Sequence, residues 1–107
     1  MNGPSKPARR NRRKNTSGPL FALGQTVATP GALAALGRNG STGLELLARH
    51  ATGDWGEVDA EDRAENDYSV SRRLRILSAY TLRDGTRLWI ITEADRSVTT
   101  LLLPDEY

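Results

Sequence analysis

The stretch LRILSAYTLRDGTRLWIITE (residues 74–93) decides the fold that the sequence predicts. Two runs rich in apolar, β-branched and aromatic residues flank an Asp-Gly pair at residues 84–85. An Asp-Gly pair between two such runs predicts a β-hairpin, because both residues tolerate the positive φ angles of a tight turn. In the second run alternate side chains point to opposite faces, and both sets are apolar: Leu88 with Ile90, and Trp89 with Ile91. This pattern predicts a central strand with helices over at least one face.

A third β-rich run, SVTTLLLP (residues 97–104), follows a second turn and ends at a proline. Three antiparallel strands in meander order are the simplest arrangement of these runs. Residues 20–28 form either a short strand or an extended lead-in. The expected fold is therefore α+β, with two to three short helices packed on a three-stranded antiparallel β-meander, with or without an N-terminal strand.

Capping residues mark the predicted helices. Thr29 precedes Pro30, and a polar N-cap followed by proline at the first helical position indicates a helix start. Ser41 or Thr42 is the expected N-cap of a second helix, and Asp59 that of a third. Carboxylates in a first helical turn complement the positive end of the helix dipole. The acids that follow Asp59 are thus explained as a solvated helix start.

The sequence gives little support to catalysis or metal binding. A calcium loop that begins at Asp54 fails, because Asp59 stands where the sharp turn needs glycine. His50 is the only histidine, which excludes a site built from several histidines, and no G-x-S-x-G elbow is present. The absence of cysteine excludes disulfides, thiolate metal sites and cysteine nucleophiles. We therefore expect no metal, no cofactor and no catalytic residue.

The charge divides the chain into a basic arm (residues 1–19) and a single small domain (residues 20–107). Residues 1–20 hold six of the 15 basic residues and no acid, whereas the rest holds nine arginines and all 13 acids. The arm has no apolar periodicity, so we expect it to be disordered in isolation. No apolar run is long enough to span a bilayer, and no secretory signal is evident, so a cytoplasmic location and no membrane contact are expected.

The basic arm is the best binding signal. Six cations can neutralise phosphates and give salt-dependent, sequence-independent affinity for DNA or RNA; they are Lys6, Arg9, Arg10, Arg12, Arg13 and Lys14. A solubilising tail, or a start codon assigned too far upstream, is the alternative. A weaker cluster follows at Arg72, Arg73, Arg75 and Arg87. Trp55 and Trp89 are interpreted as core or semi-core packing, and no aromatic array suited to single-strand stacking is evident.

Four blocks of the domain resemble a known family: LFALGQTVATPGALAAL, LLARHATGDWG, RILSAYTL and WIITEADRSVTTLLLPDEY. They are similar to short bacterial proteins of plasmids and integrated elements, often labelled plasmid-related protein or type I restriction endonuclease subunit. The chain has no P-loop, helicase motif or methyltransferase motif, so the label implies gene neighbourhood rather than activity. The matching blocks mark the positions most worth testing: His50, Gly53, Asp54, Trp55, Thr92, Glu93, Asp95, Arg96, Pro104 and Tyr107. The candidate functional cluster drawn from them is His50, Asp54, Trp55, Glu93, Asp95 and Arg96.

The leading functional hypothesis is a non-enzymatic accessory protein of mobile-element or restriction-associated origin that binds nucleic acid or a protein partner. One alternative is an endoribonuclease-toxin-like protein, whose order of helices and β-meander this chain resembles. Its candidate residues are Arg73, Arg75, Tyr80 and Arg87. A purely structural interaction subunit is the other alternative. The sequence leaves the partner and the oligomeric state open.

Overall fold

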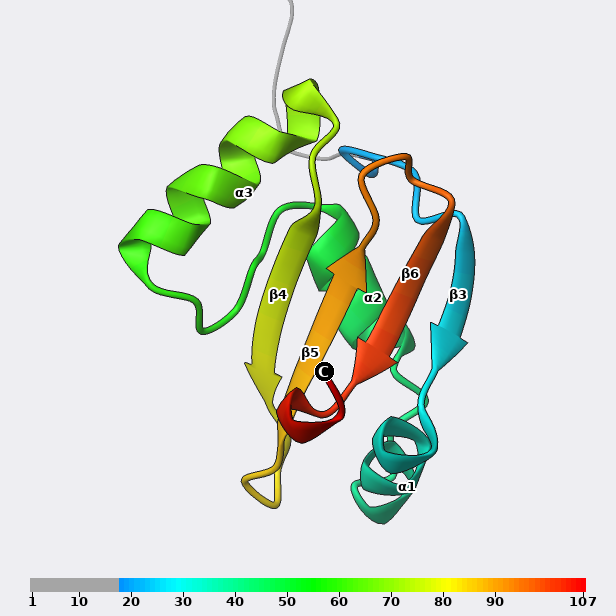
Figure 1. Ribbon diagram of the computed structural model, residues 1–107. Helices are drawn as coiled ribbons and strands as arrows, with labels where there is room; N and C mark the ends of the chain where they lie inside the picture. The colour runs from blue at the N-terminus through cyan, green and yellow to red at the C-terminus, as the bar shows by residue number, and fades with distance from the viewer. Residues whose placement is uncertain (1–17) are drawn as a thin grey trace, which may run out of the picture.

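The computed structural model describes residues 18–107, which fold as α+β around one four-stranded mixed sheet (Figure 1). The elements follow in the order β3 (Gln25–Ala28), α1 (Pro30–Arg38), α2 (Leu44–Ala51), α3 (Ala60–Arg72), β4 (Ile76–Thr81), β5 (Arg87–Thr92), β6 (Val98–Leu102) and the 3₁₀ helix η2 (Pro104–Glu106). The predicted hairpin is present as β4 and β5, and β5 is central as expected. The α+β class is therefore confirmed.

The sheet differs from the prediction at β3. Its strand order is β3-β6-β5-β4, and β3 lies parallel to β6, with Gln25 opposite Val98. The predicted three-stranded antiparallel meander is present as β4, β5 and β6. The N-terminal strand that the sequence left open joins it, so the sheet is four-stranded and mixed rather than three-stranded and antiparallel. The sequence did not reveal this pairing, because two parallel neighbours are joined by a long crossover. Here the crossover contains every element from α1 to β5. The residues of β3 carry no local signal of which edge they join.

The capping predictions hold for two helices of three. Thr29 Oγ1 accepts a hydrogen bond from the Ala32 amide at 3.1 Å, which caps α1. Asp59 caps α3 by accepting from the Asp62 amide at 2.8 Å. The cap expected for α2 at Ser41 or Thr42 is wrong, because Gly43 is the N-cap at φ 85° without a side-chain bond. A left-handed residue at this position favours glycine over any polar side chain.

The two faces of the sheet have different covers. The back face packs on α1 and α2 and contains the main core, including Leu36, Leu88 and Ile90. In Figure 1 α2 lies behind the sheet, whereas the front is covered only at one end by η2 and the C-terminus. Trp89 faces this front side, because side chains alternate along β5.

The edge strand β4 is closed by hydrogen bonds from two segments. The Asn66 side chain of α3 donates to the Leu77 carbonyl at 2.7 Å and accepts from the Leu77 amide at 3.2 Å. Ala79 bonds likewise to the backbone of Trp55 and Glu57. A free edge is a template for association with other chains, so these contacts protect this side of the sheet.

Candidate functional site

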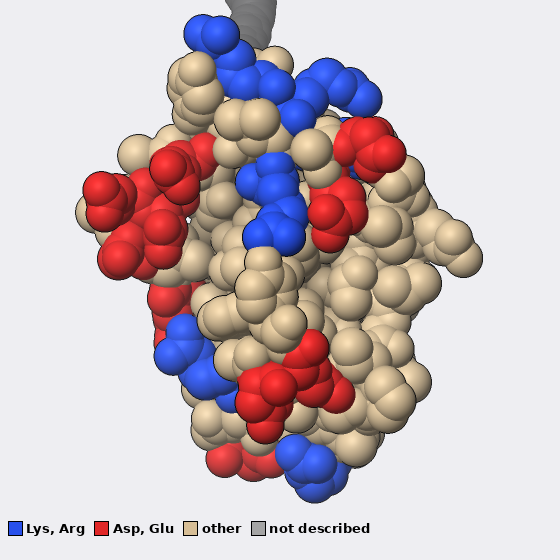
Figure 2. Space-filling view, in the orientation of Figure 1, with Lys and Arg blue, Asp and Glu red and all other residues tan. Residues whose placement is uncertain are grey.

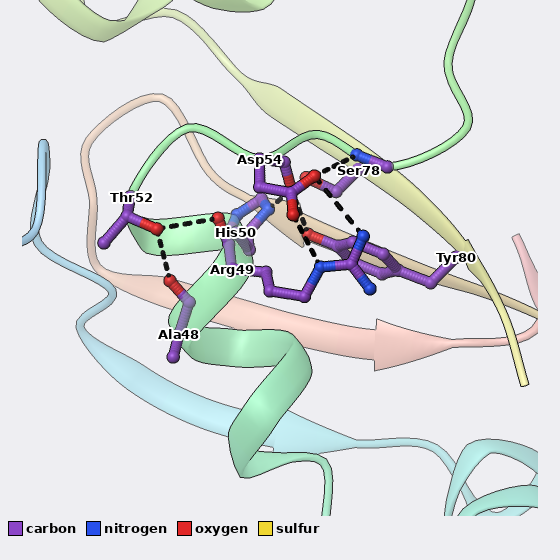
Figure 3. A network of polar contacts seen from close by, with 8 residues as sticks. Ala48, Arg49, His50, Thr52, Asp54, Ser78 and Tyr80 are labelled. Carbon is purple, nitrogen blue, oxygen red and sulfur yellow. Dashed lines mark hydrogen bonds and ion pairs between the residues drawn. The ribbon is translucent and has the colours of Figure 1, made fainter.

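His50, on the last turn of α2, is fully buried (0% exposed) with both ring nitrogens engaged (Figure 3). Nδ1 lies 2.6 Å from Ser78 Oγ on β4, and Nε2 lies 2.9 Å from Thr92 Oγ1 on β5. Two side-chain hydrogen bonds of His50 therefore join α2 to the sheet within an otherwise apolar layer. Buried polar groups of this kind are tolerated only when every donor and acceptor is satisfied.

The direction of each hydrogen bond in this network follows from its last member. Thr99 Oγ1 donates to the Leu23 carbonyl at 2.7 Å, because a carbonyl oxygen only accepts. The single hydroxyl proton of Thr99 is then used, so Thr92 donates to Thr99 across 2.7 Å. Thr92 must in turn accept from His50 Nε2–H. His50 Nδ1 is consequently the acceptor of the Ser78 hydroxyl, which defines a neutral Nε2–H imidazole.

The electrostatic surroundings of His50 also favour a neutral ring. Burial is the main cause that lowers the pKa of His50 to about 4, and the nearby positive charge of Arg96 contributes to the same shift. A ring with no free nitrogen and no solvent access does not serve as a general base, because a base needs hydrogen-bond reach to its substrate. His50 therefore acts as a structural connector between α2 and the sheet.

Phe21 is the centre around which three of the six predicted site residues meet. Its ring contacts His50 edge-on at 5.3 Å between centroids and stacks on Trp55 at 6.1 Å. The Arg96 guanidinium lies 5.4 Å from the centre of the same ring. Sequence reasoning missed Phe21, although it is the only phenylalanine in the chain and the second residue of the first resemblance block.

Arg96 is buried (7% exposed) and bonds to backbone carbonyls. It donates to Leu74 O and Ser69 O, both at 2.7 Å, and more weakly to the carbonyls of its own turn. Ser69 lies in the last turn of α3, where the negative helix end favours a cation. Arg96 therefore ties the β5–β6 turn to the junction between α3 and β4.

Asp54 belongs to a separate surface pair. Its carboxylate accepts from Arg49 Nε at 2.7 Å, and this bond is the main cause that lowers the pKa of Asp54. The Arg49 guanidinium lies 4.7 Å from the centre of the Tyr80 ring, and the Tyr80 hydroxyl donates to the Asp54 carbonyl (Figure 3). Burial raises the pKa of Tyr80 to about 12. The Asp54 carboxylate is thus not an orienting partner for His50.

Glu93 and Asp95 lie in the β5–β6 turn rather than in the buried cluster. The Asp95 carboxylate accepts from the Ser97 hydroxyl at 2.6 Å and from the Ser97 amide at 3.0 Å, which lowers its pKa. Glu93 contributes its backbone to the turn by bonding to Val98 O and Arg96 N. The six predicted residues therefore divide into three that meet at Phe21 and three that shape the surface.

Within residues 18–107, no group of three or more His, Asp or Glu side chains is placed to hold a metal ion. The residues suggested for an endoribonuclease-like site do not converge either. Tyr80 is 2% exposed, and Arg87 begins β5 at the end of the sheet opposite to Arg75. The six cations of the arm lie outside the described residues.

Comparison of the chain with protein-family models, curated proteins and solved structures returns no match. The resemblance to plasmid-related proteins accordingly stays a prediction. In the described part of the chain, no helix has the length and apolar character to cross a membrane.

One exposed surface remains beside the buried cluster. Arg72, Arg73 and Arg75 are all exposed at the α3–β4 junction, and we call them the basic end. Arg72 ends α3, Arg73 is its C-cap at φ 57°, and Arg75 directly precedes β4. Figure 2 shows basic side chains gathered at this end and down the front, with acidic side chains on both sides.

Proposed function

We propose that the protein is a non-enzymatic accessory module that binds nucleic acid through phosphate contacts. The observation that carries the proposal is that the basic end lies where the described chain begins. Phe21 contacts Arg96, which bonds to Ser69 and Leu74 on either side of Arg72 and Arg73. The six cations of residues 1–19 are therefore joined to the domain beside three further exposed arginines.

Charge distribution supports a local contact rather than general attraction. Residues 21–107 hold 13 acids against nine arginines, so the domain as a whole does not favour a polyanion. Affinity must come from the basic end together with the arm, where counterion release gives a strong salt dependence. Origin in a mobile element, which the resemblance implies, forms part of the proposal, and a protein partner is its main alternative.

The test is fluorescence anisotropy of labelled duplex and single-stranded oligonucleotides over a range of salt. One variant replaces the six arm cations by glutamine, and a second replaces Arg72, Arg73 and Arg75. We expect each variant to weaken binding and to reduce the slope of log K against log salt by about 0.7–0.9 per lost phosphate contact.

A matched control removes three arginines at the opposite end of the sheet, as Arg38→Gln, Arg83→Gln and Arg87→Gln. These residues are exposed, and the control loses as much charge as the basic-end variant. Its salt slope should stay close to that of the intact chain. Failure of the intact chain to bind any oligonucleotide would overturn the proposal, as would an equal loss in the control. A stoichiometric protein partner without nucleic-acid binding would support the interaction-subunit alternative.

A further inference from the structure

Two aromatic side chains meet on the front face of the sheet. The rings of Trp89 on β5 and Tyr107 at the C-terminus lie 5.7 Å apart, edge to face. Tyr107 is 64% exposed and Trp89 is partly exposed. In Figure 1 only η2 and the C-terminus lie over this end of the front, and α2 lies behind the sheet. The exposure of Tyr107 leaves the pair accessible to a ligand.

Arg75 connects this aromatic pair to the basic end. Its Nη2 donates to the Tyr107 hydroxyl, and its guanidinium lies 5.4 Å from the centre of the Tyr107 ring. One continuous strip therefore runs from Arg72 and Arg73 through Arg75 to Tyr107 and Trp89. Cationic groups occupy one end of the strip and π surfaces the other. We call Arg75, Tyr107 and Trp89 the stacking platform.

We propose that the stacking platform binds the bases of a single-stranded nucleic acid while the basic end and the arm hold its phosphates. This inference rests on the proposed function. Bases in a duplex have their faces covered by neighbouring pairs, whereas unpaired bases stack on aromatic rings and on guanidinium planes. A surface that binds only phosphates would not distinguish a duplex from a single strand. An exposed aromatic pair beside such a surface favours the single strand.

The front face is the part of the sheet that suits this role. The back face is filled by α1 and α2, with Leu88 and Ile90 fully buried. The other exposed tyrosine with an arginine over its ring is Tyr68, 4.9 Å from the Arg72 guanidinium, and it belongs to α3 rather than to the sheet. Tyr68 therefore offers a matched comparison with Tyr107.

The experiment measures the affinity of the intact chain for one sequence as single-stranded DNA, single-stranded RNA and duplex DNA. Tyr107→Ala should weaken binding of the single strands about tenfold, the scale of one stacked base, and leave duplex binding unchanged. Tyr107→Phe keeps the ring and should bind nearly as the intact chain does. Tyr68→Ala removes an exposed tyrosine away from the platform and should leave the single-strand preference intact.

Tryptophan emission supplies a second readout that does not depend on a variant. Trp55 is 1% exposed, so quenching by a single-stranded oligonucleotide reports on Trp89. Equal affinity for duplex and single strands, with Tyr107→Ala unchanged, would overturn the inference while leaving the proposed function standing. Absence of binding to every oligonucleotide would instead remove the proposed function itself. A difference in affinity between single-stranded DNA and single-stranded RNA would show whether the surface favours deoxyribose or ribose.

Discussion

At the residue scale, His50 shows how burial decides what a titratable group can do. A lone histidine near an aspartate suggests acid–base chemistry, but both of its nitrogens are used by Ser78 and Thr92. The hydroxyl chain that ends at the Leu23 carbonyl leaves one arrangement of protons. The ring is therefore held neutral, and its protonation requires that the network be broken.

This arrangement predicts a pH-dependent stability. The pKa of His50 is 6.5 in the unfolded chain and about 4 in the fold, so the unfolded state binds the extra proton between these values. The stabilising contribution is nearly complete at pH 7 and falls as the pH drops, by about 2 kcal/mol between pH 7 and pH 5. Urea unfolding of the intact chain and of His50→Gln at pH 7 and pH 5 measures this contribution.

His50→Gln should be less stable at pH 7 and should lose most of the dependence over this interval. The neighbouring Asp54 does not mimic the effect, because the ordinary pKa of its carboxyl is 3.8 and the fold lowers that pKa. The same slope with and without His50 would contradict the prediction.

At the element scale, α3 stabilises the sheet by closing an edge rather than by filling the core. Its buried residues are Asn66 and Ser69, and the bidentate amide of Asn66 takes the place of a neighbouring strand at Leu77. The Ser69 carbonyl, for its part, accepts from Arg96. A helix with so little apolar surface is therefore held in place by polar side chains and carbonyls.

Asn66→Ala should lower the free energy of unfolding by about 1–3 kcal/mol, because it leaves the amide and carbonyl of Leu77 without partners. Chemical denaturation measures this loss. The exposed edge should also increase self-association with concentration, which analytical ultracentrifugation detects. Glu65→Ala, an exposed neighbour on the same helix, is the control and should change neither quantity. Wild-type stability in Asn66→Ala would show that α3 is held by other contacts.

At the scale of the whole molecule, the segment before β3 joins distant elements. Phe21 packs against residues of α2, the loop before α3 and the β5–β6 turn through His50, Trp55 and Arg96. The Leu20 amide donates to Ala51 O at 2.8 Å, at the end of α2. The N-terminal segment is thus part of the core, and it sets where the basic arm leaves the domain.

Phe21→Ala should therefore destabilise the entire domain, by about 3–5 kcal/mol for loss of a buried phenylalanine. Thermal unfolding followed by circular dichroism should show one transition at lower temperature rather than local fraying. Leu20→Ala is the neighbouring control, because Leu20 is 53% exposed and should cost far less. A small and equal effect of the two substitutions would mean that residues 20–24 are not integral to the fold.

The sequence by itself determined the features that depend on neighbours along the chain. The Asp-Gly turn gave the β4–β5 hairpin, alternation identified β5 as central, and Thr29 and Asp59 marked two helix starts. Each of these rests on backbone preference or hydrogen bonding within a few residues. The cap of α2 was assigned wrongly because polar residues precede the helix. The backbone at the cap position is left-handed, which favours Gly43 instead.

Only the tertiary structure decided the parallel pairing of β3 with β6, the burial of His50 and the meeting of Trp89 with Tyr107. Trp89 is partly buried, in line with its interpretation as core or semi-core packing, but the sequence did not reveal its aromatic partner Tyr107. Such contacts join segments that have no preference for each other until the sheet and helices pack together. Their energy comes from simultaneous burial and from satisfying polar groups in one arrangement, which no short stretch of sequence encodes.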